Sequence, residues 1–248
     1  MRDDDRVLLF HYHLFKNAGT SVDEMLKDNF GHRWDQKEFS ARPPGRNALE
    51  VEAYLRSRPD LDAFSSHTAN LPLPVLKGRK VFPLFFLRHP IDRIRSAYAF
   101  ERKQQADTFG AALAKQEDFA GYARALLEHP THRQTRNFQT YRLAFAQPVG
   151  CGSELERAQA TLAALPFIGL VETFEPSLER LQALLEPLFP GFEAVFKRKN
   201  VTQSNAQTLQ QRLERIAQEL GPPLNDALWG ANADDLALFE SVREQYAA

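Results

Sequence analysis

The sequence has 248 residues, a length that suits one α/β domain with a single buried core. Hydrophobic residues make up 43% and charged residues 25%, which excludes a disordered or fibrous chain. The 31 lysines and arginines balance 32 aspartates and glutamates, so we expect no nucleic-acid partner and any anion site must be built locally. We therefore expect a single domain over residues 1–248.

The first part of the chain predicts a strand, a tight loop and a helix. A short apolar run fills Arg6 to His13 and is typical of a buried parallel strand. A polar turn follows from Lys16 to Gly19, and hydroxyl and acidic residues begin a helix at Thr20. The polar segment 35–47 contains two prolines and a glycine, which predicts a surface loop.

A second strand-to-helix junction is predicted near residue 88. The run from Lys80 to Leu87 is strongly apolar, and Pro83 within it indicates a strand that is bulged or paired on one side only. Pro90 suits the first turn of a helix that reaches about Lys103. A short segment is expected around 64–68 and a third short strand at 167–171. The remaining helices are expected over 49–58, 119–127, 132–145, 154–164, 176–185, 208–220 and 234–246. This alternation predicts an α/β fold, a three-layer parallel sheet with helices on both faces.

The sequence has a single cysteine and shows no pattern of a secretory signal or a membrane span. Cys151 is the single cysteine, which excludes an internal disulfide and a cysteine-rich zinc site. Aspartates precede the first apolar run, the reverse of a secretory signal, and no stretch approaches the roughly 18 to 20 apolar residues of a membrane span. We expect a cytoplasmic protein with no transmembrane segment, and no pattern indicates its oligomeric state.

The junction HLFKNAGTS has the composition of a phosphate-binding loop. Ligands of open parallel sheets bind beyond the carboxyl ends of the strands, where helix N-termini present unpaired N–H groups. Small residues let the backbone approach an anion there, the hydroxyls of Thr20 and Ser21 donate, and Lys16 adds a full positive charge. The Walker A pattern instead has its lysine directly after the second glycine. A capped helix with a surface lysine is the alternative interpretation.

The segment LRHPIDRIRSAY is a second candidate anion site. Arg88 directly follows the apolar strand, where a guanidinium can bind a phosphate through two hydrogen bonds, and Ser96 lies about two turns into the following helix. Solvated arginines on an amphipathic helix explain Arg93 and Arg95 but not Arg88. Two such junctions on one sheet favour a ligand with two separated phosphate groups.

These two segments resemble motifs of the carbohydrate sulfotransferases that use 3′-phosphoadenosine 5′-phosphosulfate (PAPS), in particular the heparan sulfate 2-O-sulfotransferase branch and its bacterial relatives. The resemblance implies a P-loop-like sulfotransferase fold, PAPS as cofactor, adenosine 3′,5′-bisphosphate as product and a hydroxyl-bearing, carbohydrate-like acceptor. The segments NFQTYRLAF and KNVTQSN are also similar to later parts of the family pattern. Phe15 stands where the family usually has proline, and His89 where an acidic residue is common.

The resemblance also implies the roles of individual residues. The 5′-phosphosulfate would be bound by Lys16, Asn17, Ala18, Gly19, Thr20 and Ser21, the 3′-phosphate by Arg88 and Ser96, and the cofactor further by Lys199 and Asn200. Sulfonate transfer needs positive charge at the leaving group and a base for the acceptor proton. Lys16 is the candidate for the first role. His67 is the candidate base, because the family has a histidine in the loop between the two motifs, and Glu172 is the second candidate.

Other interpretations stay open at this point. His11 and His13 lie two apart on one face of a strand, but no third ligand of fitting spacing accompanies them, so we expect buried packing and no metal. A nucleotide-dependent small-molecule kinase would also use phosphate loops at such junctions. A non-catalytic adenosine bisphosphate-binding protein is the third interpretation.

Overall fold

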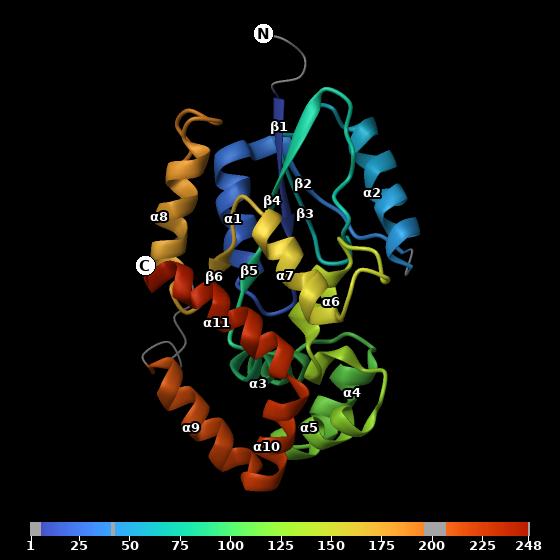
Figure 1. Cartoon of the computed structure of the whole chain (residues 1–248), viewed down its shortest axis with the longest axis vertical. Coiled ribbons are helices and arrows are strands. Elements are labelled where there is room, and N and C mark those ends of the chain that lie inside the picture. Colours follow the sequence, from blue (N-terminus) through green and yellow to red (C-terminus); the bar gives the residue numbers. More distant parts are fainter. Residues whose placement is uncertain (1–5, 41–42, 196–206, 248) are drawn as a thin grey trace. The chain divides into compact units, whose positions relative to one another are not determined.

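The computed structural model describes residues 6–40, 43–195 and 207–247, and its contacts divide the chain into two compact units (Figure 1). The first unit comprises the described residues of Met1–Leu87 and Arg142–Lys197, and the second those of Arg88–Tyr141 and Arg198–Ala248. We describe each unit by itself. The expectation of one domain over residues 1–248 stays a prediction.

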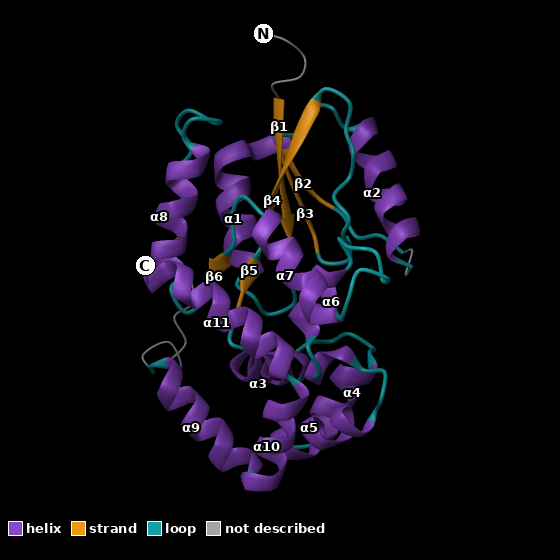
Figure 2. Ribbon diagram, in the orientation of Figure 1, coloured by secondary structure: helices purple, strands orange, loops and turns teal. Residues whose placement is uncertain are grey.

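A parallel sheet forms the centre of the first unit (Figure 2). Its strand order is β2-β3-β1-β4, and every pairing between these strands is parallel. The strands are β1 (Arg6–Tyr12), β2 (Trp34–Gln36), β3 (Ala63–Ser66) and β4 (Arg79–Leu84). A second, two-stranded parallel sheet joins β5 (Phe86–Leu87) to β6 (Gly169–Leu170). The carboxyl ends of β1, β2 and β3 therefore meet at one edge.

Helices cover both faces of this sheet, as predicted. Alternate residues of β1 point to opposite faces. Leu9 belongs to a buried cluster with side chains of α1 (Gly19–Phe30) and α8 (Phe174–Leu185). On the other face Phe10 packs against Phe64, whose ring also contacts Tyr54 of α2 (Pro44–Ser57). The first unit also contains η2 (Gly31–Arg33) and α7 (Glu154–Ala164).

The second unit is helical in its described residues. Its elements are α3 (Pro90–Glu101), α4 (Phe109–Gln116), α5 (Phe119–Glu128), η3 (Arg133–Thr135), α9 (Leu209–Leu220), α10 (Pro222–Ala231) and α11 (Ala233–Ala247). Side chains of α3, α5, α9 and α10 form its buried core, which includes Ile94, Tyr122, Ile216 and Leu228. A further helix, α6 (Phe138–Ala144), crosses the boundary between the two units.

The apolar run at 80–87 forms two short strands. β4 pairs with β1 and is an edge strand of its sheet, which agrees with the expectation that Pro83 tolerates pairing on one side only. After Phe85 the chain pairs with β6, where the Gly169 N–H donates to the Phe85 carbonyl at 2.9 Å. The residues predicted as one strand therefore form two strands, β4 and β5, which belong to different sheets.

Several predicted boundaries were wrong. The segment predicted as a loop over 35–47 contains most of β2, and α2 begins at Pro44 because proline fits the first helical positions. The predicted helix over 132–145 is divided at Asn137, whose φ is 43°. Two helices, α4 and α10, were not predicted. Within the described ranges, no helix is long and apolar enough to cross a membrane.

Candidate functional site

The loop between β1 and α1 alternates in the sign of φ. Lys16 and Ala18 both have positive φ, 65° and 60°, whereas Asn17 between them does not. Such alternation is typical of anion-binding nests, but here the N–H of Asn17 donates to the Leu14 carbonyl at 3.2 Å. The Asn17 side chain fixes the loop to the second sheet by donating to the Phe86 carbonyl at 2.7 Å. Left-handed backbone at two non-glycine residues costs about 1 to 2 kcal/mol each, a cost typical of functional loops.

The N-terminus of α1 is open to a ligand. Its N-cap residue is Ala18, which has no side-chain oxygen, so no side chain caps the first turn. The N–H groups of Gly19 and Thr20 lie in that turn, where an α-helix lacks its own acceptors. Thr20 is exposed and Ser21 is half-buried. These residue types suit a phosphate or sulfate group, since the first turn of a helix carries N–H groups without intrahelical acceptors and a partial positive charge.

Gly19 is required by the close approach of a histidine ring. A Cβ atom at this position would lie 1.9 Å from His13 Cδ2 and 2.0 Å from His13 Nε2. No side chain can occupy that space while the ring stays in place. The His13 ring therefore lies directly over the first residue of α1, at the loop predicted to bind phosphosulfate.

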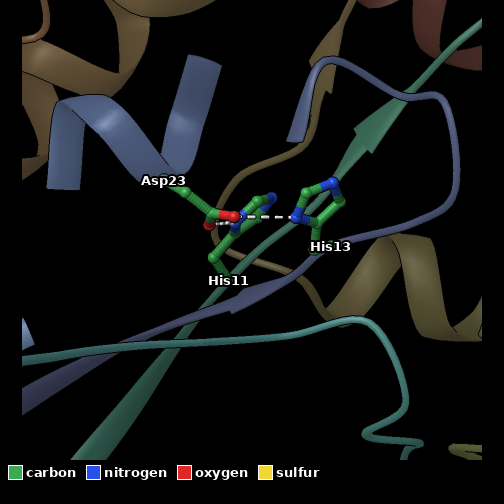
Figure 3. A group of neighbouring side chains, drawn as sticks. All are labelled: His11, His13 and Asp23. Carbon is green, nitrogen blue, oxygen red and sulfur yellow. Dashed lines mark hydrogen bonds and ion pairs between the residues drawn. The ribbon is translucent and has the colours of Figure 1, made fainter. Parts of the chain in front are cut away.

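Asp23 of α1 bridges the two histidines of β1 and its following loop. Figure 3 shows both imidazoles turned toward its carboxylate. The Nδ1 atoms of His11 and His13 lie 2.7 and 2.8 Å from the two oxygens of Asp23. Both histidines are buried. Asp23 is the third group that sequence spacing did not reveal, because it reaches the strand only when α1 packs back on the sheet.

Burial and hydrogen bonding shift the pKa values of Asp23 and His13. Burial raises the pKa of Asp23, but hydrogen bonds from His11 and His13 outweigh it and hold the pKa well below its ordinary value. Burial lowers the pKa of His13 below its ordinary value, although its bond to Asp23 opposes this. The three ligand atoms lie within 4.8 Å of one another, as in a metal site. Both carboxylate oxygens already accept an imidazole hydrogen, however, so the geometry favours a hydrogen-bonded bridge.

The candidate base His67 lies beside His13. The register pairs Tyr12 with Ser66, so the next residue of each strand, His13 and His67, leave the sheet side by side. Their ring centroids are 3.7 Å apart and the ring planes differ by 31°. The His67 side chain is 41% exposed, so one part of the ring stays open to a ligand. The structure therefore brings His67 and the predicted phosphosulfate loop together.

Glu38 is a contact of His67 that the sequence did not indicate. Its carboxylate lies 2.8 Å from His67 Nδ1 and accepts the N–H groups of His67 and Thr68 at 3.1 and 2.9 Å. Burial raises the pKa of Glu38, but these hydrogen bonds outweigh it and lower the pKa to about 2. Glu38 lies two residues past β2, in the segment predicted as a loop. A prediction of β2 would have placed it at the same sheet edge.

The second predicted motif lies in the second unit. Arg88 donates through Nε and Nη2 to one oxygen of Asp92, at 2.9 and 2.7 Å, and Arg212 Nε donates to the other oxygen at 2.9 Å. Burial raises the pKa of Asp92, but the charges of Arg88 and Arg212 outweigh it and hold the pKa below its ordinary value. Two guanidinium groups around one carboxylate leave a net positive charge. Ser96 is half-buried on α3.

Four other positions named from the sequence have different outcomes. His89 is buried between Trp229 and Phe239, and burial lowers its pKa to about 4, so it packs as an apolar side chain. Glu172 lies two residues beyond β6 and is half-buried. Lys199 and Asn200 lie outside the described residues.

Comparisons with known proteins agree with the motif analysis. A family model described as "Sulfotransferase family" matches residues 1–240. An uncharacterized protein of Archaeoglobus fulgidus is 42% identical to this chain over 249 residues, which cover 98% of each sequence. The family match takes in the loop at 16–21, His67 and the segment that begins at Arg88.

Proposed function

Because the chain belongs to the sulfotransferase family, we propose that it transfers a sulfonate group from PAPS to a hydroxyl of a carbohydrate-like acceptor. Family membership makes the chain a transferase enzyme. The proposal concerns the cofactor, the acceptor class and the residues involved. The observation that supports it most is the loop of alternating φ at Lys16 to Ala18, which leads into an uncapped helix.

Residues 16–21 are the proposed site of the 5′-phosphosulfate. Gly19 and Thr20 would donate backbone N–H groups, Thr20 and Ser21 their hydroxyls, and Lys16 a charge that offsets the negative charge gained by the leaving phosphate. Bound PAPS would supply the sulfonate group, with adenosine 3′,5′-bisphosphate as the product. Arg88 and Ser96 are the proposed ligands of the 3′-phosphate, and Lys199 and Asn200 are proposed to contact the cofactor.

His67 is the proposed base. Its Nδ1 lies against the Glu38 carboxylate, so its Nε2 is the nitrogen that would accept the acceptor hydroxyl proton. The hydroxyl oxygen then forms a bond to sulfur as the bond between sulfur and the phosphate oxygen breaks. Glu172 remains the second candidate. The carbohydrate-like acceptor is proposed from the motif resemblance alone.

Ligand titration tests this function against the two alternatives. We expect adenosine 3′,5′-bisphosphate to bind more tightly than ATP with magnesium, and Lys16→Ala and Arg88→Ala to weaken that binding. Equal or tighter binding of ATP would instead support a kinase. A sulfonate-transfer assay then separates an enzyme from a binding protein, because a binding protein shows no turnover with any hydroxyl acceptor.

A further inference from the structure

Three neighbouring strands place a carboxylate and two imidazoles in a row. β2, β3 and β1 are adjacent and parallel, with Gln36 opposite Ser65 and Tyr12 opposite Ser66. Glu38, His67 and His13 each follow the end of one of these strands. They therefore lie side by side at the sheet edge although they are far apart in the sequence.

The Glu38 carboxylate holds one edge of the His67 ring and its backbone together. It contacts the ring at Nδ1 and accepts two consecutive backbone N–H groups, those of His67 and Thr68. Because an ionised carboxylate only accepts hydrogen bonds, Nδ1 must carry the proton. The Gln36 Nε2 contact with Nδ1 is longer, 3.3 Å, and joins two nitrogens, so the carboxylate determines the tautomer.

Other charged and titratable groups restrain His67 from its remaining sides. The His13 ring packs against the His67 ring at a tilt, with centroids 3.7 Å apart and 31° between the planes, and is itself held by Asp23. Arg142 Nη2 donates to the His67 carbonyl at 3.3 Å and to the Ala69 carbonyl at 2.7 Å. A partly exposed histidine rarely has its tautomer, ring face and backbone all restrained, and such restraint is what a general base needs.

We propose that Glu38 is the positioning residue of His67, holding the proton on Nδ1 so that Nε2 stays free to accept a proton, with the ring of His13 as the platform beneath it. The inference deepens the proposed function and rests on it for the role of Nε2. The arrangement follows the logic of an acid that orients a histidine base, here assembled from the ends of three parallel strands.

Histidine side-chain NMR tests the positioning without any need for turnover. In ¹⁵N-labelled protein, with the His67 signals identified by their loss in His67→Gln, we expect the Nδ1–H tautomer in the unaltered chain. Glu38→Gln should produce a mixture of tautomers, and Glu38→Asp should restore part of the original population. Glu52→Gln is the matched control, because it makes the same substitution at a carboxylate on α2, where Glu52 pairs with Arg56. An Nε2–H tautomer in the unaltered chain, or a spectrum unchanged by Glu38→Gln, overturns the proposal.

Kinetics then report what the positioning contributes. Glu38→Gln should lower kcat on the order of 10²-fold with little change in KM, because the base loses its orientation, and Glu38→Asp should recover part of the rate. A rise in KM alone, or no recovery in Glu38→Asp, would indicate a purely structural role and overturn the proposal. If the unaltered chain transfers no sulfonate while the tautomer result holds, the proposed function fails and the positioning of His67 by Glu38 stands.

Discussion

Replacement of Gly19 by alanine should disrupt the candidate site through one atom. The new Cβ would lie 1.9 Å from His13 Cδ2, 2.0 Å from Nε2 and 2.4 Å from Cγ, so the ring must leave its position. The ring has little room to move, because its Nδ1 is bound to Asp23 and it packs against the His67 ring with centroids 3.7 Å apart. The substitution should therefore break the bond to Asp23 and displace His67 together with the loop.

The expected cost combines two effects. Overpacking of a tight contact costs about 1 to 3 kcal/mol, and loss of a hydrogen bond to a charged group costs about 1.5 to 3 kcal/mol. Relaxation of the loop offsets part of the sum, so we expect the free energy of unfolding to fall by about 2 to 4 kcal/mol. Binding of adenosine 3′,5′-bisphosphate should also weaken, because the N–H groups of the first turn lose their alignment.

Denaturant unfolding followed by circular dichroism, together with bisphosphate titration, measures both effects. Gly45→Ala is the matched control, because Gly45 is also near a helix start, on α2, and a Cβ there meets no atom within 4 Å. It should be neutral or stabilise slightly, since alanine favours the helix over glycine by up to about 1 kcal/mol. If Gly19→Ala unfolds and binds like Gly45→Ala, the reasoning that places His13 over the loop is refuted.

Other substitutions test the two anion-binding motifs. Lys16→Ala should lower kcat by about 10² to 10³ in the transfer assay, as for loss of a group that stabilises developing negative charge, whereas a rise in KM alone would indicate ground-state binding only. Arg88→Ala should raise the Kd for adenosine 3′,5′-bisphosphate by about 10- to 100-fold, and Arg95→Ala, whose guanidinium pairs with a glutamate at 2.8 Å, should not; equal effects would contradict the assignment. Asp92→Asn should destabilise the fold by about 3 kcal/mol at neutral pH, because Arg88 and Arg212 lose their shared carboxylate. Because the folded-state pKa of Asp92 is lowered, its contribution is present above the ordinary carboxyl pKa and is lost as pH falls through the folded value, so unfolding of the variant should depend less on acid pH.

Local patterns identified the loop and its helix because the relevant signals lie close together in the chain. The apolar run at β1, the small residues after it and the hydroxyls of α1 all fall within residues 6–21. The residues expected to bind an anion lie at the start of α1, which has no side-chain cap. The distinction between packed histidines and a ligand set was harder, since Asp23 joins His11 and His13 only through the packing of α1 on the sheet.

The contact between His67 and Glu38 could not be predicted from the sequence. Three residues of β2 are too few to produce an alternating pattern, so the segment was predicted as a loop and Glu38 passed unnoticed. Arg212 was not predicted as a partner of Asp92 either, because the two residues are 120 positions apart in the sequence.

The sequence alone determined the α/β class and the two strand-to-helix junctions, because these depend on short-range periodicity and composition. Only the tertiary structure decided which side chains meet: the register of β2, β3 and β1 places Glu38, His67 and His13 at one edge. Strand order and register depend on packing between distant segments, and a short stretch of sequence carries little information about its partner.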